Sequence, residues 1–317
     1  MAAAVEPHPA VRAADVLWRF SRPHTIIGTT LSVLGLWLIA DAEAGRPVLN
    51  QFDPAIRPDL SLVDLLATLI AALAVNVSIV GINQITDVDI DRINKPFLPI
   101  AAGDLTLNQA KAIVAAATVI PLGMALTQGA AETVAVAAAL AVGALYSLPP
   151  TRLKRFPVAA SLCISGVRSL AVNLGVYAHF AGRIDPPVIA LCAFVLPFSF
   201  AIAVLKDVPD IEGDRRFSIR TFSVRLGPER VKAIGLTALI AAYLGMAIPG
   251  AIALRDHAQP VVMAAGHLAA LVILCVWARA ADPRDHAAFT RFYMRVWALF
   301  FLEYVLVPLA CLLSGAG

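Results

Sequence analysis

The chain has 317 residues, of which 59% are hydrophobic and only 15% are charged. A soluble domain carries roughly a quarter charged residues, so this composition excludes an ordinary soluble protein. The net charge of +3 gives no support to a nucleic-acid partner. A helix of about 20 apolar residues crosses the hydrocarbon core of a bilayer, and the many such stretches in this chain predict a polytopic membrane protein.

An amphipathic segment at residues 11–20 precedes the first apolar stretch, and we expect it to lie on the membrane surface. Nine apolar helices follow it. They are expected at residues 24–41, 62–86, 109–127, 132–148, 158–180, 187–206, 232–253, 260–279 and 292–314. The third and fourth are separated only by a tight turn near Gly129. The sequence thus predicts an all-α integral membrane protein, a single domain over residues 1–317 with an N-terminal interfacial segment at 1–20.

Lysine and arginine residues divide unequally between the two sides that nine spans create. The N-terminus shares one side with the loops at 87–108, 149–157, 207–231 and 280–291, and this side holds most of the 25 basic residues. The other side holds only Arg46, Arg57, Arg183 and Arg255. Because cytoplasmic loops carry the excess of lysine and arginine, we expect the N-terminus and these loops in the cytoplasm and the C-terminus on the opposite side.

Two acidic segments recur along the chain at a constant offset. Asp87 and Asp210 are separated by 123 residues, as are Asp91 and Asp214. This recurrence predicts two related four-helix halves, at about 21–150 and 151–280, followed by a ninth helix. Proteins built from such repeats commonly bind their ligands at the repeat interface. A chance match of short acidic motifs is the alternative.

The oxygen-bearing side chains of both acidic segments have helical spacing. They are Asn83, Asp87 and Asp91 in the first segment and Asp207, Asp210 and Asp214 in the second. We expect each set to form one stripe of a helix at the cytoplasmic end of an apolar span. Carboxylates brought together repel each other unless a cation or another positive partner compensates, and Mg²⁺ is typically held by carboxylates and substrate phosphates. The pattern therefore favours a magnesium-diphosphate site over a solvated acidic loop.

Basic and hydroxyl side chains lie on the same predicted side. The basic ones are Arg92, Lys95, Arg152, Lys154, Lys206 and Arg215. Cationic donors stabilise the negative charge that builds on a departing diphosphate, so we expect these residues to bind it. Tyr146 and Ser147 are candidate hydroxyl donors. The alternatives are that the cations merely set the topology and that the two hydroxyl residues only pack at a helix end.

With these motifs the chain resembles the UbiA superfamily of membrane prenyltransferases over nearly its whole length. The NxxxDxxxD motif of the family matches residues 83–91, its second aspartate-rich motif matches 207–214, and its basic motif resembles 146–155. The resemblance implies a magnesium-dependent enzyme in a UbiA-type helix bundle. It implies catalytic roles for Asp87, Asp91, Lys206, Asp210 and Asp214 and substrate binding by Arg22, Asn83, Lys95, Arg152, Lys154 and Asp207.

Within the superfamily, the likeness is greatest to the homogentisate prenyltransferases, on segments 20–29, 93–99, 167–175 and 206–214. Ile100 and Ser169 depart from the expected pattern, which has leucine and glycine there. The resemblance implies transfer of a phytyl or geranylgeranyl group from prenyl diphosphate to homogentisate, with loss of the carboxyl group, in tocopherol and prenylquinone biosynthesis. Alternatives are 4-hydroxybenzoate or chlorophyllide as acceptor, solanesyl diphosphate as donor and, from a different class, a secondary transporter.

Arg168 lies well inside the fifth predicted span. An arginine at such depth is costly and usually faces the bundle interior with a partner. We expect it to recognise the carboxylate of the aromatic acceptor, with Asn173 and His179 as polar neighbours. A buried ion pair with one of the aspartates is the alternative.

An apolar helix bundle can house a long prenyl tail and exclude the water that would quench a carbocation. Phe194, Phe198 and Phe200 of the sixth span are candidates to line such a cavity, and plain packing is their alternative role. The sequence leaves the oligomeric state and the length of the donor chain open.

Overall fold

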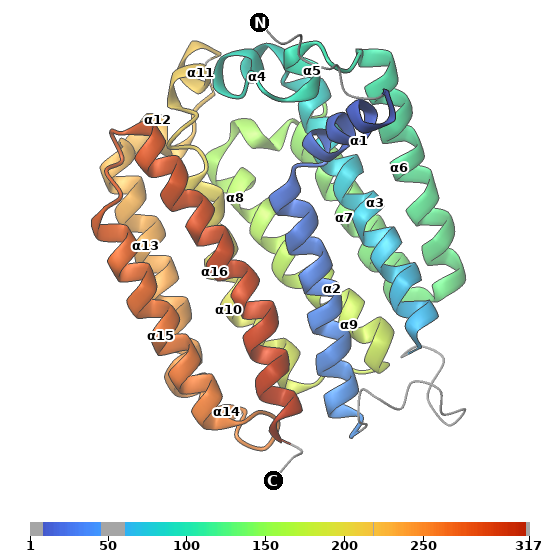
Figure 1. The fold of residues 1–317 in the computed structure, drawn as a ribbon, viewed down its shortest axis with the longest axis vertical. Helices are drawn as coiled ribbons and strands as arrows, with labels where there is room; N and C mark the ends of the chain where they lie inside the picture. The colour runs from blue at the N-terminus through green and yellow to red at the C-terminus, as the bar shows by residue number, and fades with distance from the viewer. Residues whose placement is uncertain (1–8, 46–60, 218, 315–317) are drawn as a thin grey trace, which may run out of the picture.

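Nine helices that are long and apolar enough to span a membrane make up most of the described chain. The computed structural model describes residues 9–45, 61–217 and 219–314, and these ranges contain no strand. Figure 1 shows the long helices running side by side, with α1 at one end of the bundle and the end of α16 at the other. The prediction of an all-α, multi-pass integral membrane protein is confirmed.

The nine spans agree closely with the predicted ones. They are α2 (Pro23–Glu43), α3 (Leu62–Thr86), α6 (Leu107–Gln128), α7 (Ala130–Ser147), α8 with η3 and α9 (Pro157–Ala181), α10 (Pro186–Leu205), α13 with η4 and α14 (Pro228–Ala253), α15 (Pro260–Arg279) and α16 (His286–Leu312). Within the fifth span, η3 is a π-helix over Val167–Val172 that separates α8 (Pro157–Gly166) from α9 (Asn173–Ala181). Within the seventh, a second π-helix, η4 (Met246–Gly250), separates α13 (Pro228–Gly245) from α14 (Ala251–Ala253).

Two helices begin earlier than hydropathy predicts. The side chain of Asp285 accepts hydrogen bonds from the backbone N–H groups of Ala287 and Ala288, so α16 begins at His286 rather than 292. Pro228 is pre-organised for the first helical position, and α13 begins there rather than at 232. Both extensions are polar sequences, which a search for apolar stretches passes over.

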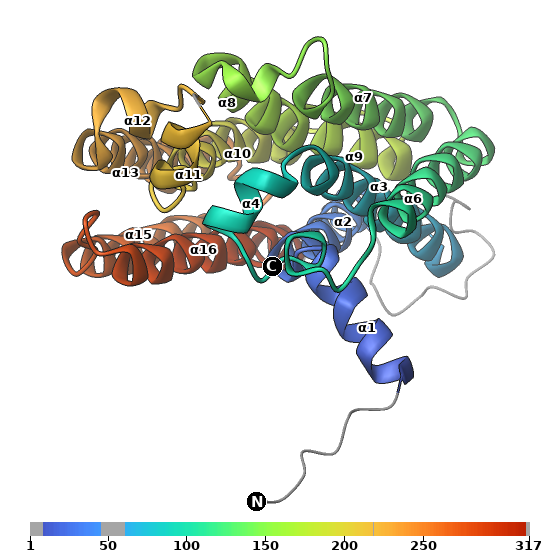
Figure 2. The same cartoon turned by 90° about the horizontal axis from the view of Figure 1, so that it is seen from above.

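Short helices cover the end of the bundle at which α2 begins (Figures 1 and 2). They are α1 (Pro9–Phe20), α4 (Val88–Asn94), α5 (Pro99–Ala102), η2 (Leu153–Arg155), α11 (Ile211–Arg216) and α12 (Phe222–Leu226). The helix α1 agrees with the amphipathic segment predicted at 11–20, while residues 1–8 of the predicted N-terminal segment 1–20 lie outside the described part. Val16 and Phe20 of α1 are buried against Ile100 and Leu105. Its place on a membrane surface stays a prediction.

The acidic motifs do not form the expected continuous helical stripes. The helix α3 ends at Thr86, Asp87 takes a non-helical conformation, and α4 begins at Val88. The helix α10 ends at Leu205, and α11 begins only at Ile211. An unbroken helix would carry its carboxylates away from the bundle into solvent. The two breaks instead turn α4 and α11 across the bundle end, where they contact each other. They occur at corresponding places in the two predicted halves, and the repeat itself stays a prediction.

Glycines allow the long helices to approach closely. A Cβ atom added at Gly35 of α2 would lie 2.8 Å from the backbone oxygen of Tyr304 in α16. Because a backbone oxygen cannot rotate away as a side chain can, α2 and α16 depend on this glycine for their contact. A Cβ atom added at Gly123 of α6 would meet nothing within 4 Å.

These two glycines give a matched test of the packing. We expect Gly35→Ala to lower the free energy of unfolding by about 1–3 kcal/mol, the usual cost of overpacking. Gly123→Ala is the control and is expected to be neutral or stabilising, because alanine is the better helix former. Thermal unfolding of the purified variants in detergent measures both. Equal stability of the two variants would contradict the close contact between α2 and α16.

Candidate active site

The first acidic motif is held by cations from the loop after α7. Asp87 forms ion pairs with Arg152 Nη2 at 3.0 Å and with Lys154 Nζ at 2.6 Å. Asn83, one turn earlier on α3, donates to Asp87 at 3.1 Å and accepts from Arg22 at 3.5 Å. Since Arg22 begins α2, this one cluster ties together α2, α3 and the loop after α7.

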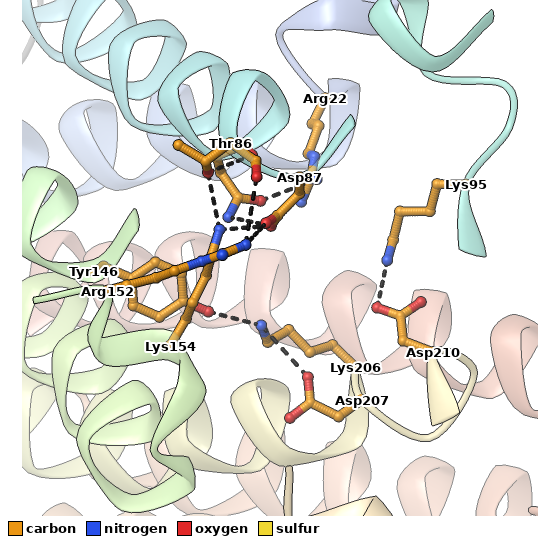
Figure 3. Close-up of polar contacts among 11 residues, drawn as sticks. Arg22, Thr86, Asp87, Lys95, Tyr146, Arg152, Lys154, Lys206, Asp207 and Asp210 are labelled. Atoms are coloured by element: carbon orange, nitrogen blue, oxygen red, sulfur yellow. Dashed lines mark hydrogen bonds and ion pairs between the residues drawn. The ribbon is translucent and has the colours of Figure 1, made fainter. Parts of the chain in front are cut away.

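The second motif has its own cationic partners. Lys206 lies 3.5 Å from Asp207 and donates to the Tyr146 hydroxyl at 3.0 Å. Lys95, which directly follows α4, forms an ion pair with Asp210. Figure 3 shows these groups approaching one another from α7, α10 and the segment after α4. Side chains far apart in the sequence are therefore brought to one end of the bundle.

Two further carboxyl groups of the motifs are buried. Asp91 is 5% exposed, and its Oδ2 atom has no hydrogen-bond partner in the described part of the chain. Burial raises the pKa of Asp91 to about 6. Burial, with the nearby charges of Asp207 and Asp210, raises the pKa of Asp214 to about 7. For both carboxyl groups, burial outweighs the nearby positive charges, Arg22 and Lys95 for Asp91 and Lys206 and Lys95 for Asp214, which favour the ionised form.

Asn94 joins the two motifs directly. Its side chain donates to the backbone oxygen of Asp210 at 3.1 Å and accepts from the backbone N–H of Gly213 at 2.9 Å. A Cβ atom added at Gly213 would lie 2.3 Å from the Asn94 Oδ1 atom, so only glycine fits there. Neither residue was expected from the sequence to have a role. The only indication was that both lie in segments, 93–99 and 206–214, that resemble the homogentisate prenyltransferases.

The residues present fit a divalent cation. The donors are hard oxygens, as Mg²⁺ prefers, and the buried Oδ2 atom of Asp91 has no hydrogen-bond partner among the described residues. No three acidic, histidine or cysteine side chains in the described residues stand close enough together to hold an ion by themselves. Several of the motif carboxylates are instead paired with lysine or arginine, so a cation that arrived with an anionic ligand would exchange partners with these bases.

Backbone strain is concentrated at this site. Among the described residues, only Arg22 and Arg152 combine a side chain with positive φ, at 55° and 39°. Such conformations cost on the order of 1–3 kcal/mol each and persist where the surroundings hold them. Both guanidinium groups contact the first acidic motif, Arg22 through Asn83 and Arg152 through Asp87.

A cavity of about 280 Å³ opens beneath the two motifs. Arg22, Asn83, Tyr146 and Lys206 line it where it meets the charged cluster. Its remaining lining is mainly apolar and comes from α2, α3, α7, the fifth span, α10 and α16. The charged site therefore continues into an apolar chamber inside the bundle.

The aromatic wall of this cavity comes from α16. Tyr293, Trp297, Phe300 and Tyr304 line it, and their spacing of three and four residues places them on one face of that helix. The expectation that Phe194, Phe198 and Phe200 line the cavity is wrong. Phe194 and Phe198 instead stack on each other in the core, with ring centres 5.3 Å apart, and Phe200 is not among the lining residues. Helical spacing alone does not say which face of a bundle helix meets a cavity.

Arg168 lines the cavity from the π-helix η3. Its guanidinium carbon lies 4.8 Å from the ring centre of Trp297 and 5.3 Å from that of Phe300. Its Nη1 atom is buried without a hydrogen-bond partner in the described chain. The alternative of an ion pair with a motif aspartate is wrong, since no described carboxylate lies within ion-pair distance of Arg168. His24 also contacts the Trp297 ring, at 4.9 Å between ring centres.

Several predicted site residues lie elsewhere. Asn173 accepts from the Tyr304 hydroxyl at 2.8 Å, behind the cavity wall. His179 is bonded to Asp64 at 2.8 Å, near the opposite end of the bundle, so it is not a neighbour of Arg168. Arg92 turns to Asp89, at 2.8 Å, rather than to the motif aspartates.

Two more of the predicted site residues differ from expectation. Ser147 is buried but does not line the cavity. Arg215 is exposed, outside the cluster of Figure 3. Both follow residues that do contact the site, Tyr146 and Asp214, and a step of one residue along a helix turns a side chain by about 100°. Thr86 was not anticipated; its hydroxyl accepts from Lys154 at 3.0 Å.

Comparisons with known proteins agree on one family. The sequence profile of the UbiA prenyltransferase family matches residues 55–301. The chain is 43% identical to the homogentisate phytyltransferase of Synechocystis sp., over 93% of this chain and 95% of that protein. It is 36% identical to the chloroplastic homogentisate phytyltransferase 1 of Arabidopsis thaliana, over 93% of this chain and 75% of the relative. It is 37% identical to the homogentisate solanesyltransferase of the same plant, over 94% and 77%.

Solved structures share the fold. A UbiA homolog from Archaeoglobus fulgidus, described as bound to GPP and Mg²⁺, superposes with a TM-score of 0.58 at 20% identity, over 92% of this chain and 99% of that one. A digeranylgeranylglyceryl phosphate synthase superposes with a TM-score of 0.64 at 17% identity, over 93% and 98%. These likenesses confirm the predicted UbiA-type bundle.

The bridge made by Asn94 can be tested with inorganic diphosphate. We expect Mg²⁺ with inorganic diphosphate to raise the melting temperature of the wild-type protein, because a ligand that binds the folded state stabilises it. Asn94→Ala removes two hydrogen bonds, each worth about 0.5–1.5 kcal/mol, and is expected to lower the melting temperature and to weaken diphosphate binding about tenfold. Arg92→Ala, which removes an exposed neighbour, is the control. A diphosphate response that Asn94→Ala leaves intact would contradict the bridge.

Proposed function

The chain belongs to the UbiA prenyltransferase family, and we propose that it transfers a phytyl or geranylgeranyl group from prenyl diphosphate to homogentisate, in tocopherol and prenylquinone biosynthesis. The chain is an enzyme by this membership, so the transporter alternative falls away. The proposal rests on one arrangement. A cluster of carboxylates and cations adjoins an apolar cavity, and an unpaired arginine lies at the aromatic wall of that cavity.

The two motifs suit the diphosphate end of the donor. Asn83, Asp87, Asp91, Asp207, Asp210 and Asp214 would hold Mg²⁺, whose positive charge would balance the carboxylates and the diphosphate together. Lys95, Arg152, Lys154 and Lys206 would donate to the diphosphate oxygens. These cations are already gathered at the site by their aspartate partners, which places them for the charge that develops as diphosphate leaves.

The proposed transfer breaks one bond in the donor. The bond between the allylic carbon and the diphosphate oxygen breaks, and its electron pair stays with the diphosphate. A ring carbon of homogentisate forms the new carbon–carbon bond to the allylic carbon, and the ring loses a proton. The carboxyl group of the acetate side chain leaves as carbon dioxide, and the remaining methylene carbon takes up a proton to become a methyl group.

The cavity supports this chemistry through its walls. Its apolar lining excludes the water that would otherwise capture an allylic cation. Trp297 and Phe300 present aromatic rings to the cavity, and ring faces attract a cation. The donor tail and the acceptor ring would therefore meet beneath the diphosphate cluster, out of contact with solvent.

Arg168 would hold the acceptor by its carboxylate. Its Nη1 atom is buried and unpaired, and a charged hydrogen bond is worth about 1.5–3 kcal/mol. Stacking on Trp297 and Phe300 fixes the guanidinium plane. Because 4-hydroxybenzoate and chlorophyllide also carry a carboxylate, this contact alone does not select homogentisate. The names of the relatives with 36–43% identity favour homogentisate over both.

The charged end of the bundle would face the cytoplasm. The described basic residues of this end, among them Lys95, Arg152 and Lys206, follow the excess that marks cytoplasmic loops. Arg46 and Arg57, which were assigned to the opposite side, lie outside the described residues. The last helix, α16, ends at the other end of the bundle (Figure 1), so the C-terminus would face away from the cytoplasm.

The function is tested with purified protein in lipid nanodiscs. We expect prenylated, decarboxylated product and released diphosphate when homogentisate is supplied with phytyl or geranylgeranyl diphosphate and Mg²⁺. Chelation of Mg²⁺ is expected to abolish the product, because the carboxylates would then repel the diphosphate. Mass spectrometry identifies the product. Product from 4-hydroxybenzoate and none from homogentisate would overturn the acceptor assignment.

Arg168→Ala tests the carboxylate contact. We expect the KM for homogentisate to rise about 10–100-fold, the loss of one charged hydrogen bond, with the KM for the donor almost unchanged. The methyl ester of homogentisate is the matched control, since it lacks the charge and is expected to bind the wild type and the variant alike. An equal loss of affinity for donor and acceptor would show that Arg168 only supports the fold.

A further inference from the structure

The cavity extends along the whole length of α7. Glu132, Ala135, Ala139, Gly143 and Tyr146 all line it from one face of this helix. Tyr146 lies at the charged end, beside Lys206, and Glu132 lies in the first turn of α7, at the opposite end. Fourteen residues at 1.5 Å each separate these two side chains by about 21 Å along the helix axis. The cavity therefore has a deep arm that leads away from the diphosphate cluster.

The deep arm differs in character from the aromatic wall. Its lining side chains are small and aliphatic, including Ala72 and Val75 of α3, Ala139 of α7, and Val172 and Val176 of the fifth span. The aromatic and cationic groups of the lining lie instead on α16, at Arg22 and His24 near the start of α2, at Arg168 of η3, and at Tyr146 and Lys206 beside the charged cluster. Aliphatic surface suits a prenyl chain, because burying each methylene group contributes about 0.8 kcal/mol. The deep arm is the part of the cavity that fits the tail of the donor.

The arm ends on a buried carboxyl group. Glu132 is 1% exposed, and its Oε2 atom has no hydrogen-bond partner among the described residues. Asp64 and His179, which are bonded to each other at 2.8 Å, are the titratable groups that act on it electrostatically. Beside it α7 and α9 close together, since a Cβ atom added at Gly175 would lie 2.4 Å from the Ala135 Cβ atom. The aliphatic lining of the deep arm thus ends at the carboxyl group of Glu132, which we call the polar floor of the arm.

We propose that Glu132 sets the longest prenyl chain that the enzyme accepts. This inference rests on the proposed function, in which the deep arm holds the donor tail. A chain that reached Glu132 would press hydrocarbon against its carboxyl group, and an unpartnered polar group in an apolar surrounding is costly. A shorter chain ends among the alanine and valine side chains and incurs no such cost.

The test compares two donors that differ by one isoprene unit. The ratio of kcat/KM for geranylfarnesyl diphosphate to that for geranylgeranyl diphosphate is measured with homogentisate as acceptor. Glu132→Ala removes the polar floor and adds space, so we expect this ratio to rise by about tenfold or more, as extra methylene groups become buried. Ala139→Leu narrows the arm nearer to the charged end and is expected to lower the ratio.

Val134→Ala is the matched control, because Val134 lies on the same turn of α7 but is exposed; its ratio is expected to equal that of the wild type. A merely structural role for Glu132 would lower the rates with both donors and leave their ratio unchanged, and that result would overturn the inference. If Glu132→Ala fails to fold, an unchanged ratio in Ala139→Leu overturns it instead. Failure of the wild-type protein to use any donor overturns the proposed function, and this inference with it.

Discussion

The carboxylates at the ends of the apolar helices need positively charged partners, and the rest of the structure depends on this requirement. Asp87, Asp207 and Asp210 lie where two membrane spans end, and each contacts a lysine or arginine. Several of these cations come from distant segments, so the ion pairs bind the ends of separate helices together. Removing one partner of a buried pair leaves an uncompensated charge, which is strongly destabilising. The same pairs that close the bundle also gather the groups that bind a diphosphate.

This constraint explains why the helices break where they do. A carboxylate on a continuing helix would move 1.5 Å farther from the bundle with each residue and would lose its partner. The break at Asp87 and the turn between α10 and α11 keep the acidic side chains over the cavity. The strained backbone of Arg22 and Arg152 belongs to the same arrangement, because each must turn its side chain toward the first motif.

The interior depends on irregularities of a different kind. Arg168 lies in a π-helical segment, and such segments occur often at functional sites. Next to it, Ser169 donates to the backbone oxygen of Cys192 while Cys192 donates to that of Ser169. These reciprocal bonds join η3 to α10 and fix the helix that carries the arginine. A serine that departs from the expected family pattern therefore has a structural role of its own.

The sequence by itself determined the nine spans, the acidic motifs and the family, because hydropathy, helical spacing and motif identity are properties of neighbouring residues. Only the tertiary structure decided which faces line the cavity, which excluded Phe194 and Phe198 and included Trp297 and Phe300. It also decided the partners of Asp87 and Asp210, and it placed Glu132 at the end of the deep arm. These contacts join residues far apart in the chain, and their distances follow from the packing of whole helices, which no local pattern records.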